Sequence, residues 1–230
     1  MTSSALNTET LSFQGSNGEL NGYLATLGDK PLPGVVIVHE NQGLTAHIQD
    51  VSRRLAQEGF AVLALDALSG HGGTPSDKDA AIAQIKQLDD SEVIANYQTA
   101  IDVLKDHPCC TGKVASLGFC WGGRVSGLLA VHSHNLDAAI IYYGKSPDSK
   151  HVEQIQCPLL LHYGATDEAI NATVPAFQAA LDAHGKSYTL HMHEGAGHAF
   201  NNDTRKDRYH ADAAVKSWKL TVDFLQRTLT

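Results

Sequence analysis

The sequence has little positive charge and no long apolar run. It carries 17 Lys and Arg against 25 Asp and Glu, which gives a net charge of -8. Nucleic acids and anionic membrane surfaces are both bound mainly through basic side chains, so this balance argues against either partner. No apolar run approaches the ~18 residues of a membrane span. The first nine residues also lack the basic and apolar regions of a signal peptide. We therefore expect a cytoplasmic protein.

Cysteine is scarce, with four in 230 residues: Cys109, Cys110, Cys120 and Cys157. So few cysteines in a chain of this length do not form a disulfide framework, and we expect free thiols in a reducing compartment. A chain this long buries roughly 70–75% of its unfolded surface, so it needs neither disulfides nor a structural metal to fold. Because no linker-like segment interrupts it, we expect one domain over residues 1–230.

Short apolar runs alternate with amphipathic segments along most of the chain. A hairpin is expected over about 10–25, around the turn dipeptide Asn17-Gly18. The alternation that follows predicts an α/β fold with a mostly parallel central sheet and helices on both faces. The expected strands cover 35–39, 60–65, 114–119, part of 137–143, 158–163 and 188–193. The expected helices cover 46–58, two stretches before 106, then 122–131, 174–184 and a last segment around 218–229.

In open sheets of this kind, ligands bind beyond the carboxyl ends of the strands. The candidate functional residues are therefore those that follow the predicted strands. They are Glu40, Asp66, Cys120, Gly144, Asp167 and His198.

The most informative of these segments is Gly118-Phe119-Cys120-Trp121-Gly122, between a predicted strand and a predicted helix. A nucleophile at the tip of a sharp strand-to-helix turn takes a strained backbone conformation, and the residues two positions away on either side must be small. The start of the helix directs N–H groups and a positive dipole end toward the thiol, which favours the thiolate. The alternative is a purely structural role, in which Cys120 is a small buried apolar residue.

The order of the remaining candidates favours the functional interpretation. In catalytic triads built on this turn, the nucleophile precedes the acid and the acid precedes the histidine. Asp167 and His198 follow Cys120 in that order, each after its own predicted strand. Glu168 is a neighbouring alternative to Asp167, which we prefer.

These segments resemble the dienelactone hydrolase (carboxymethylenebutenolidase-like) family of the α/β-hydrolase fold, from about residue 10 to the last helix. The matching segments are Val-His-Glu-Asn-Gln-Gly-Leu at 38–44, Gly-Phe-Cys-Trp-Gly-Gly at 118–123, Gly-Ala-Thr-Asp at 164–167 and Gly-His-Ala-Phe at 197–200. A glycine-flanked cysteine in place of the serine of ordinary esterases makes the resemblance fairly specific.

The resemblance implies a small-molecule ester or lactone substrate. We expect a thioester intermediate and no cofactor, and the oligomeric state, monomer or homodimer, stays open. Cys120 would be the nucleophile, His198 the general base and acid, and Asp167 the group that orients His198. Glu40 would help to deprotonate the thiol. The backbone N–H groups of Asn41 and Trp121 would form the oxyanion hole.

At the positions where the family carries its substrate-binding arginines, this chain has other residues. Family members that act on chlorocatechol-derived lactones carry an arginine four residues after the catalytic histidine, where this chain has Asn202, and Arg205 comes three residues later. Where the family has its other arginine, this chain offers only Lys78 and Lys86, and lysine lacks the bidentate fork of arginine. Asn202, Lys78 and His71 are our candidates for substrate contacts, and the exact substrate stays open.

Several alternatives remain beside this interpretation. The fold could serve as a scaffold that binds a small ligand or a partner protein with little catalysis. The pair His191 and His193, with His198 nearby, could in principle hold zinc, but no further ligand completes a familiar spacing, and we expect no metal. Asp66 is expected to act as a loop or capping residue. Cys109, Cys110 and Cys157 lack the flanking glycines and are expected to be inert.

Overall fold

The computed structural model describes residues 5–230. The first four residues, which belong to the N-terminal segment examined for a signal peptide, lie outside the described residues. The chain forms two compact units, the first ending at Ala115 and the second spanning Ser116–Thr230. No helix among the described residues is long and apolar enough to cross a membrane. The single domain over 1–230 stays a prediction.

The first unit is a mixed sheet that begins with an antiparallel hairpin. Strands β1 (Leu6–Gln14) and β2 (Glu19–Leu27) pair along their whole length, and Gly18 takes a positive φ in the turn between them. The predicted hairpin was in the right place but too short at both ends. Strand β2 then pairs antiparallel with β4 (Ala61–Leu65), and β4 pairs parallel with β3 (Leu32–Val38).

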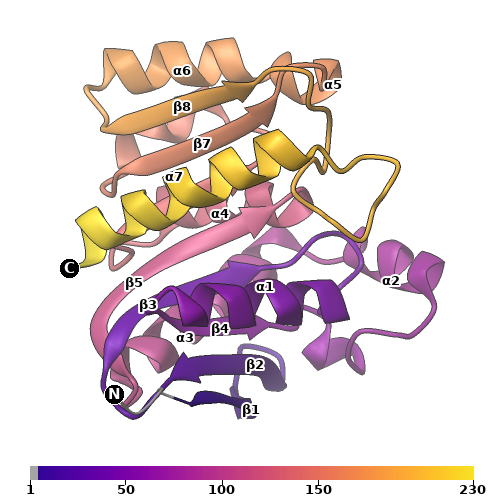
Figure 1. The fold of residues 1–230 in the computed structure, drawn as a ribbon, viewed down its shortest axis with the longest axis vertical. Coiled ribbons are helices and arrows are strands. Elements are labelled where there is room, and N and C mark those ends of the chain that lie inside the picture. The colour runs from indigo at the N-terminus through magenta and orange to yellow at the C-terminus, as the bar shows by residue number, and fades with distance from the viewer. Residues whose placement is uncertain (1–4) are drawn as a thin grey trace. The chain divides into compact units, whose positions relative to one another are not determined.

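Helices cover both faces of this sheet, with α1 (Ala46–Gln57) in front of β3 and β4 in Figure 1 and α3 (Asp90–Asp106) behind them. Helix α1 buries Ile48, Val51 and Leu55, as its 3.6-residue periodicity predicts. A short 3-10 helix η1 (Ser69–His71) and helix α2 (Lys78–Ile85) precede α3. Asp77 and Asp89 begin α2 and α3 by accepting hydrogen bonds from free backbone N–H groups, as N-cap residues do.

The second unit carries the strand order β5-β6-β7-β8, and β5 (Cys110–Phe119) crosses the boundary between the units. Strands β6 (Ala138–Tyr142), β7 (Leu159–Gly164) and β8 (Tyr188–His193) pair in parallel. Their carboxyl ends therefore meet at one edge. This is the parallel arrangement that the alternating pattern predicted.

The helices of the second unit also lie on both faces, with α7 (Ala211–Leu229) in front of β7 in Figure 1 and α4 (Trp121–His132) behind. Helix α6 (Val174–Ala183) begins with Pro175 in its first turn, as predicted. The 3-10 helix η2 (Ser149–Gln154) and the four-residue helix α5 (Glu168–Asn171) were not predicted. Strand β5 begins four residues earlier than its predicted start at 114.

Candidate active site

Cys120 stands on a strained turn between β5 and α4. Its φ of 57° and ψ of -115° lie in a region that L-residues rarely adopt. The turn is held by two backbone hydrogen bonds, from the Cys120 N–H to the Tyr142 carbonyl (3.0 Å) and from the Arg124 N–H to the Cys120 carbonyl (3.1 Å). Cys120 is half-buried.

Gly118 allows this turn to form, as the sequence predicted, and Gly123 allows a second close approach that was not predicted. A Cβ on Gly118 would lie 1.9 Å from the Gly122 carbonyl oxygen, far inside any real contact. A Cβ on Gly123 would lie 2.5 Å from the Tyr142 carbonyl oxygen. Strand, helix and the end of β6 can therefore approach one another only because side chains are missing at these positions.

His198 links Cys120 to Asp167 through its two ring nitrogens. Its Nδ1 lies 2.6 Å from Asp167 Oδ2, and its Nε2 lies 3.0 Å from Cys120 Sγ. Because a carboxylate only accepts hydrogen bonds, Nδ1 carries the proton in the neutral ring and Nε2 is the acceptor that faces the thiol. The side chains of His198 and Asp167 are 24% and 9% exposed, so the pair is only partly screened by solvent.

The loops that carry Asp167 and His198 are joined directly. Asp167 comes three residues after β7 and His198 five residues after β8. Between them, the Thr166 N–H and hydroxyl both donate to the Ala196 carbonyl at 2.9 Å. A Cβ on Gly164 would lie 2.6 Å from the Gly197 carbonyl oxygen, so this close approach also requires glycine. These contacts fix the separation between the carboxylate and the imidazole.

The residues predicted to assist the thiol lie at two places in the chain. Trp121 is the first residue of α4, directly after Cys120, so its N–H is one of the backbone N–H groups in the first turn of that helix. Glu40 and Asn41 follow β3 in the first unit, and Glu40 is 8% exposed. His39 supports their backbone: its Nε2 accepts from the Ala67 N–H (3.1 Å), so its Nδ1 donates to the Glu40 carbonyl (2.6 Å).

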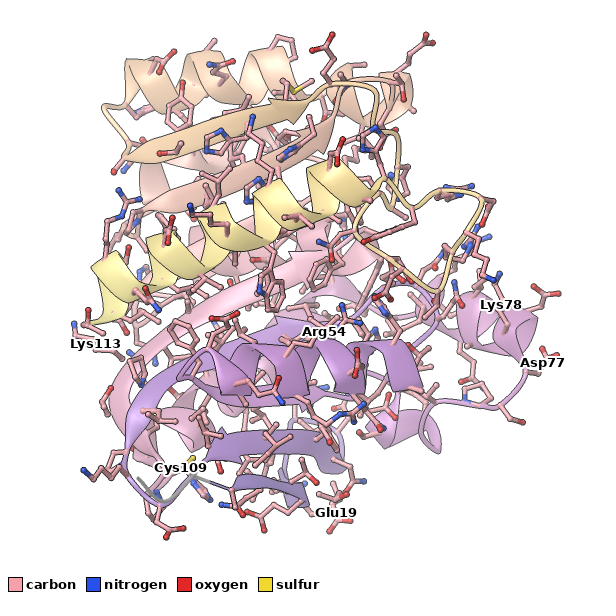
Figure 2. All side chains as sticks on the ribbon, in the orientation of Figure 1. Glu19, Arg54, Asp77, Lys78, Cys109 and Lys113 are labelled. Carbon is pink, nitrogen blue, oxygen red and sulfur yellow. The ribbon has the colours of Figure 1, made fainter. Side chains whose placement is uncertain are left out.

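The three predicted substrate-contact residues lie in different surroundings. The contacts of two of them are with neighbouring groups of the protein. Asn202 is 3% exposed, and its Oδ1 accepts hydrogen bonds from the Thr204 N–H and hydroxyl, which closes the turn after the His198 loop. His71 is exposed and lies 3.2 Å from Glu92. Figure 2 shows Lys78 beside Asp77 at the start of α2, where it is exposed. Their roles as substrate contacts stay predictions.

Asp66 is a loop-capping residue, as expected. One oxygen, Oδ1, accepts from the Leu68 N–H (3.0 Å) and the Thr74 hydroxyl (2.8 Å), and Oδ2 accepts from the Thr74 N–H (2.8 Å). A carboxylate with these three donors holds the loop after β4 in shape.

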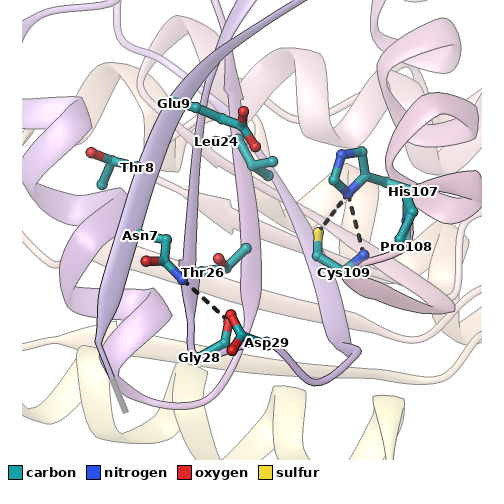
Figure 3. Close-up of a pocket in the computed structure, with 10 residues that line it drawn as sticks. All are labelled: Asn7, Thr8, Glu9, Leu24, Thr26, Gly28, Asp29, His107, Pro108 and Cys109. Carbon is teal, nitrogen blue, oxygen red and sulfur yellow. Dashed lines mark hydrogen bonds between the residues drawn. The ribbon is translucent and has the colours of Figure 1, made fainter.

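Two of the other three thiols, Cys109 and Cys157, have raised pKa values. Cys109 lies beside a cavity of about 520 Å³ in the first unit, where it is 3.0 Å from His107 Nδ1 (Figure 3). Burial, with a smaller contribution from neighbouring Cys110, raises the pKa of the Cys109 thiol to about 11. Burial also raises the pKa of Cys157 to about 12. Both thiols are therefore protonated at neutral pH and poor nucleophiles.

The histidines on β8 pack against buried His162; His193 is buried as well, and His191 is half-buried. His193 Nε2 lies 3.0 Å from His162 Nδ1, and the rings of His162 and His191 stack at 5.6 Å. His162 Nε2 is 3.2 Å from the Thr221 hydroxyl of α7. Among residues 5–230, no group of three His, Cys, Asp or Glu side chains could hold a metal ion.

The comparisons with known proteins agree with the resemblance. The family model described as "Dienelactone hydrolase family" matches residues 20–229. The chain belongs to the dienelactone hydrolase family. It is a hydrolase of the ester and lactone class and has the α/β-hydrolase fold.

Similar proteins of this family cover nearly the whole chain. A Yersinia pestis protein named "Putative carboxymethylenebutenolidase" is 31% identical over 94% of this chain and 85% of its own length. A Bradyrhizobium protein named "Probable 2-oxo-3-(5-oxofuran-2-ylidene)propanoate lactonase" is 32% identical over 95% and 96%. The crystal structure of "Putative Dienelactone Hydrolase" from Klebsiella pneumoniae subsp. pneumoniae MGH 78578 has a TM-score of 0.88 at 29% identity, over 96% of this chain and 99% of that one.

Proposed function

We propose that this protein hydrolyses small carboxylic esters or lactones with Cys120 as the nucleophile and a thioester intermediate. The observation that carries the proposal is the continuous chain of contacts from Cys120 Sγ through the His198 ring to Asp167, at 3.0 Å and 2.6 Å. A nucleophile, a base and a group that orients the base, within hydrogen-bond reach of one another, are the parts that covalent catalysis requires.

In the first half of the reaction, the Cys120 thiol gives its proton to His198 Nε2, and the thiolate attacks the carbonyl carbon. A C–S bond forms, and the carbonyl oxygen becomes an oxyanion. The N–H of Trp121 at the start of α4 and, by the family resemblance, that of Asn41 would donate to it, each worth about 3–4 kcal/mol of transition-state stabilisation. The C–O bond to the leaving group breaks, and the alkoxide takes the proton from His198.

In the second half, His198 Nε2 takes a proton from water, and the resulting hydroxide attacks the thioester. The C–S bond breaks, the acid product leaves, and the sulfur regains the proton. Asp167 keeps the His198 ring in the tautomer that presents Nε2 to the sulfur and stabilises the imidazolium that forms in each half. By resemblance, Glu40 assists the first deprotonation, since a free thiol with a pKa near ~8.5 is only a few per cent thiolate at neutral pH.

The lactonase name of the Bradyrhizobium relative favours cyclic enol esters among the substrates to be tried. The test measures hydrolysis of p-nitrophenyl acetate and of an enol lactone by wild type, Cys120→Ala and His198→Ala. We expect both variants to lose at least about 100-fold in kcat/KM, as triad members do. Cys109→Ala, which removes a thiol of high pKa, is the matched control and should keep the wild-type rate. Equal rates in all four proteins would leave the non-catalytic scaffold as the better description.

A further inference from the structure

Among the described residues, the non-glycine positions with a positive φ all lie near Cys120 or His198 in the fold. Apart from glycines, three residues among 5–230 have a positive φ: Cys120 (57°), Tyr143 (39°) and Ala199 (63°). Cys120 forms the turn that carries the thiol, and Ala199 directly follows His198. Tyr143 belongs to neither the triad nor the oxyanion hole of the proposed mechanism, yet a bulky residue in this conformation costs about 1–3 kcal/mol.

The last residue of β6 and the two residues that follow it are fixed in place around this strain. The Tyr142 carbonyl accepts the Cys120 N–H at 3.0 Å, and the Tyr143 N–H donates to the His162 carbonyl at 2.8 Å. At Gly144 the chain passes so close to α4 that a Cβ would lie 2.3 Å from the Gly123 carbonyl carbon. The backbone at Tyr143 therefore cannot relax without moving the turn that carries the nucleophile.

The strained backbone directs the Tyr143 ring against the imidazole of His198. Tyr143 is 1% exposed. Its ring centroid lies 5.2 Å from that of His198 at an interplanar angle of 60°, and 5.3 Å from Phe200 in a T-shaped contact. Aromatic pairs at such distances are worth about 0.5–1.5 kcal/mol beyond their buried area. The buried Tyr143 ring therefore packs against one side of the His198 imidazole.

We infer that Tyr143 is a positioning residue, whose ring holds the His198 imidazole in the plane that joins Asp167 to Cys120. The two hydrogen bonds of His198 fix its nitrogens but leave the ring free to tilt about the line between them. Contact with the Tyr143 ring removes that freedom. This inference rests on the proposed function and adds a residue that no motif of the sequence marks.

The experiment compares Tyr143→Phe, which keeps the ring, with Tyr143→Leu, which removes it. The matched control is Phe177→Leu, because Phe177 is equally buried but belongs to α6. Small displacements of catalytic groups reduce rates by factors of up to about 100. We expect Tyr143→Leu to lower kcat by about 10-fold or more with KM within about 3-fold. Tyr143→Phe and Phe177→Leu should stay within about 3-fold of wild type.

A second measurement needs no substrate and separates this inference from the proposed function. The rate of Cys120 alkylation by iodoacetamide is followed against pH. In Tyr143→Leu we expect the profile to move toward that of an ordinary thiol with a pKa near ~8.5, and in Tyr143→Phe to match wild type. If Tyr143→Leu does not fold, Tyr143→Met, which retains volume, takes its place.

Wild-type kcat and an unchanged alkylation profile in the ring-removing variant would overturn the inference. So would an equal loss of kcat in Phe177→Leu, since that would show a general effect of core damage. Failure of the proposed function looks different, because Cys120→Ala would then hydrolyse ester as fast as wild type.

Discussion

His198 Nδ1 lies 2.6 Å from Asp167 Oδ2, although 31 residues separate the two in the chain. The parallel pairing of β7 with β8 brings their loops to the same edge, and Thr166 joins the loops through the Ala196 carbonyl. A hydrogen bond this short between a ring N–H and a carboxylate selects one tautomer of the imidazole. The other nitrogen is then available to accept the thiol proton.

Replacing Asp167 tests this orientation. In Asp167→Asn the amide can present its NH2 group to Nδ1 and favour the wrong tautomer, so we expect kcat for ester hydrolysis to fall by about 100-fold or more. The control is Glu168→Gln, because Glu168 is the exposed acidic neighbour. It should keep the wild-type kcat. A normal rate in Asp167→Asn together with a loss in Glu168→Gln would reverse the assignment.

The turn at Cys120 predicts a large difference between two glycine substitutions. Gly118→Ala places a Cβ 1.9 Å from the Gly122 carbonyl oxygen, so strand and helix must separate. We expect a loss of about 3 kcal/mol or more in the free energy of unfolding, measured by urea denaturation. At Gly70 a Cβ meets nothing within 4 Å, and Gly70→Ala should change stability by less than about 0.5 kcal/mol. Equal urea midpoints for both variants would refute the steric argument.

The buried histidine cluster predicts acid sensitivity. Burial, together with the charges of His191, Lys216 and His210, lowers the pKa of His193 from 6.5 to about 4. Between these values the unfolded chain binds a proton that the folded chain does not, so protons favour unfolding. The stabilising contribution of neutral His193 is complete above pH 6.5 and is lost as the pH falls toward 4, by at most about 1.4 kcal/mol per pH unit.

Urea denaturation across this pH range measures the effect. We expect His193→Gln, which cannot titrate, to show a shallower fall in the free energy of unfolding with decreasing pH than wild type. His184→Gln replaces an exposed histidine and should follow the wild-type slope. His162, whose pKa burial lowers well below its usual value, keeps part of the dependence in every variant. An identical slope in His193→Gln and wild type would show that this cluster does not set the acid sensitivity.

Elements with strong periodicity or clear end signals could be predicted from the sequence. Strand β8 was predicted with its observed bounds, and α1 within one residue of them, because Gly59 marks the end of the helix. Helix α5 and the 3-10 helix η2 were missed because segments of four and six residues are too short to show a period.

The candidate site was predicted through topology rather than through contacts. Residues after parallel strands meet at one edge, so Cys120, Asp167 and His198 could be grouped without coordinates. Tyr143 could not be found in this way, because tyrosine carries no signal for a positive φ, and only its place before Gly144 at a strand end could have drawn attention to it. The contact of Asn202 could not be predicted either, because the hydrogen bond from the Thr204 N–H to its side chain is not visible in the spacing of the residues.

If Cys120 is the nucleophile, alkylation of Cys120 alone must abolish hydrolysis. The protein is treated with limiting iodoacetamide at neutral pH, peptide mass spectrometry locates the label, and ester hydrolysis is measured on the same samples. We expect Cys120 to be labelled well before Cys109 and Cys157, whose pKa values of about 11 and about 12 keep them protonated. We also expect activity to fall in proportion to the labelled fraction of Cys120. Full activity in protein whose Cys120 is completely alkylated would contradict it.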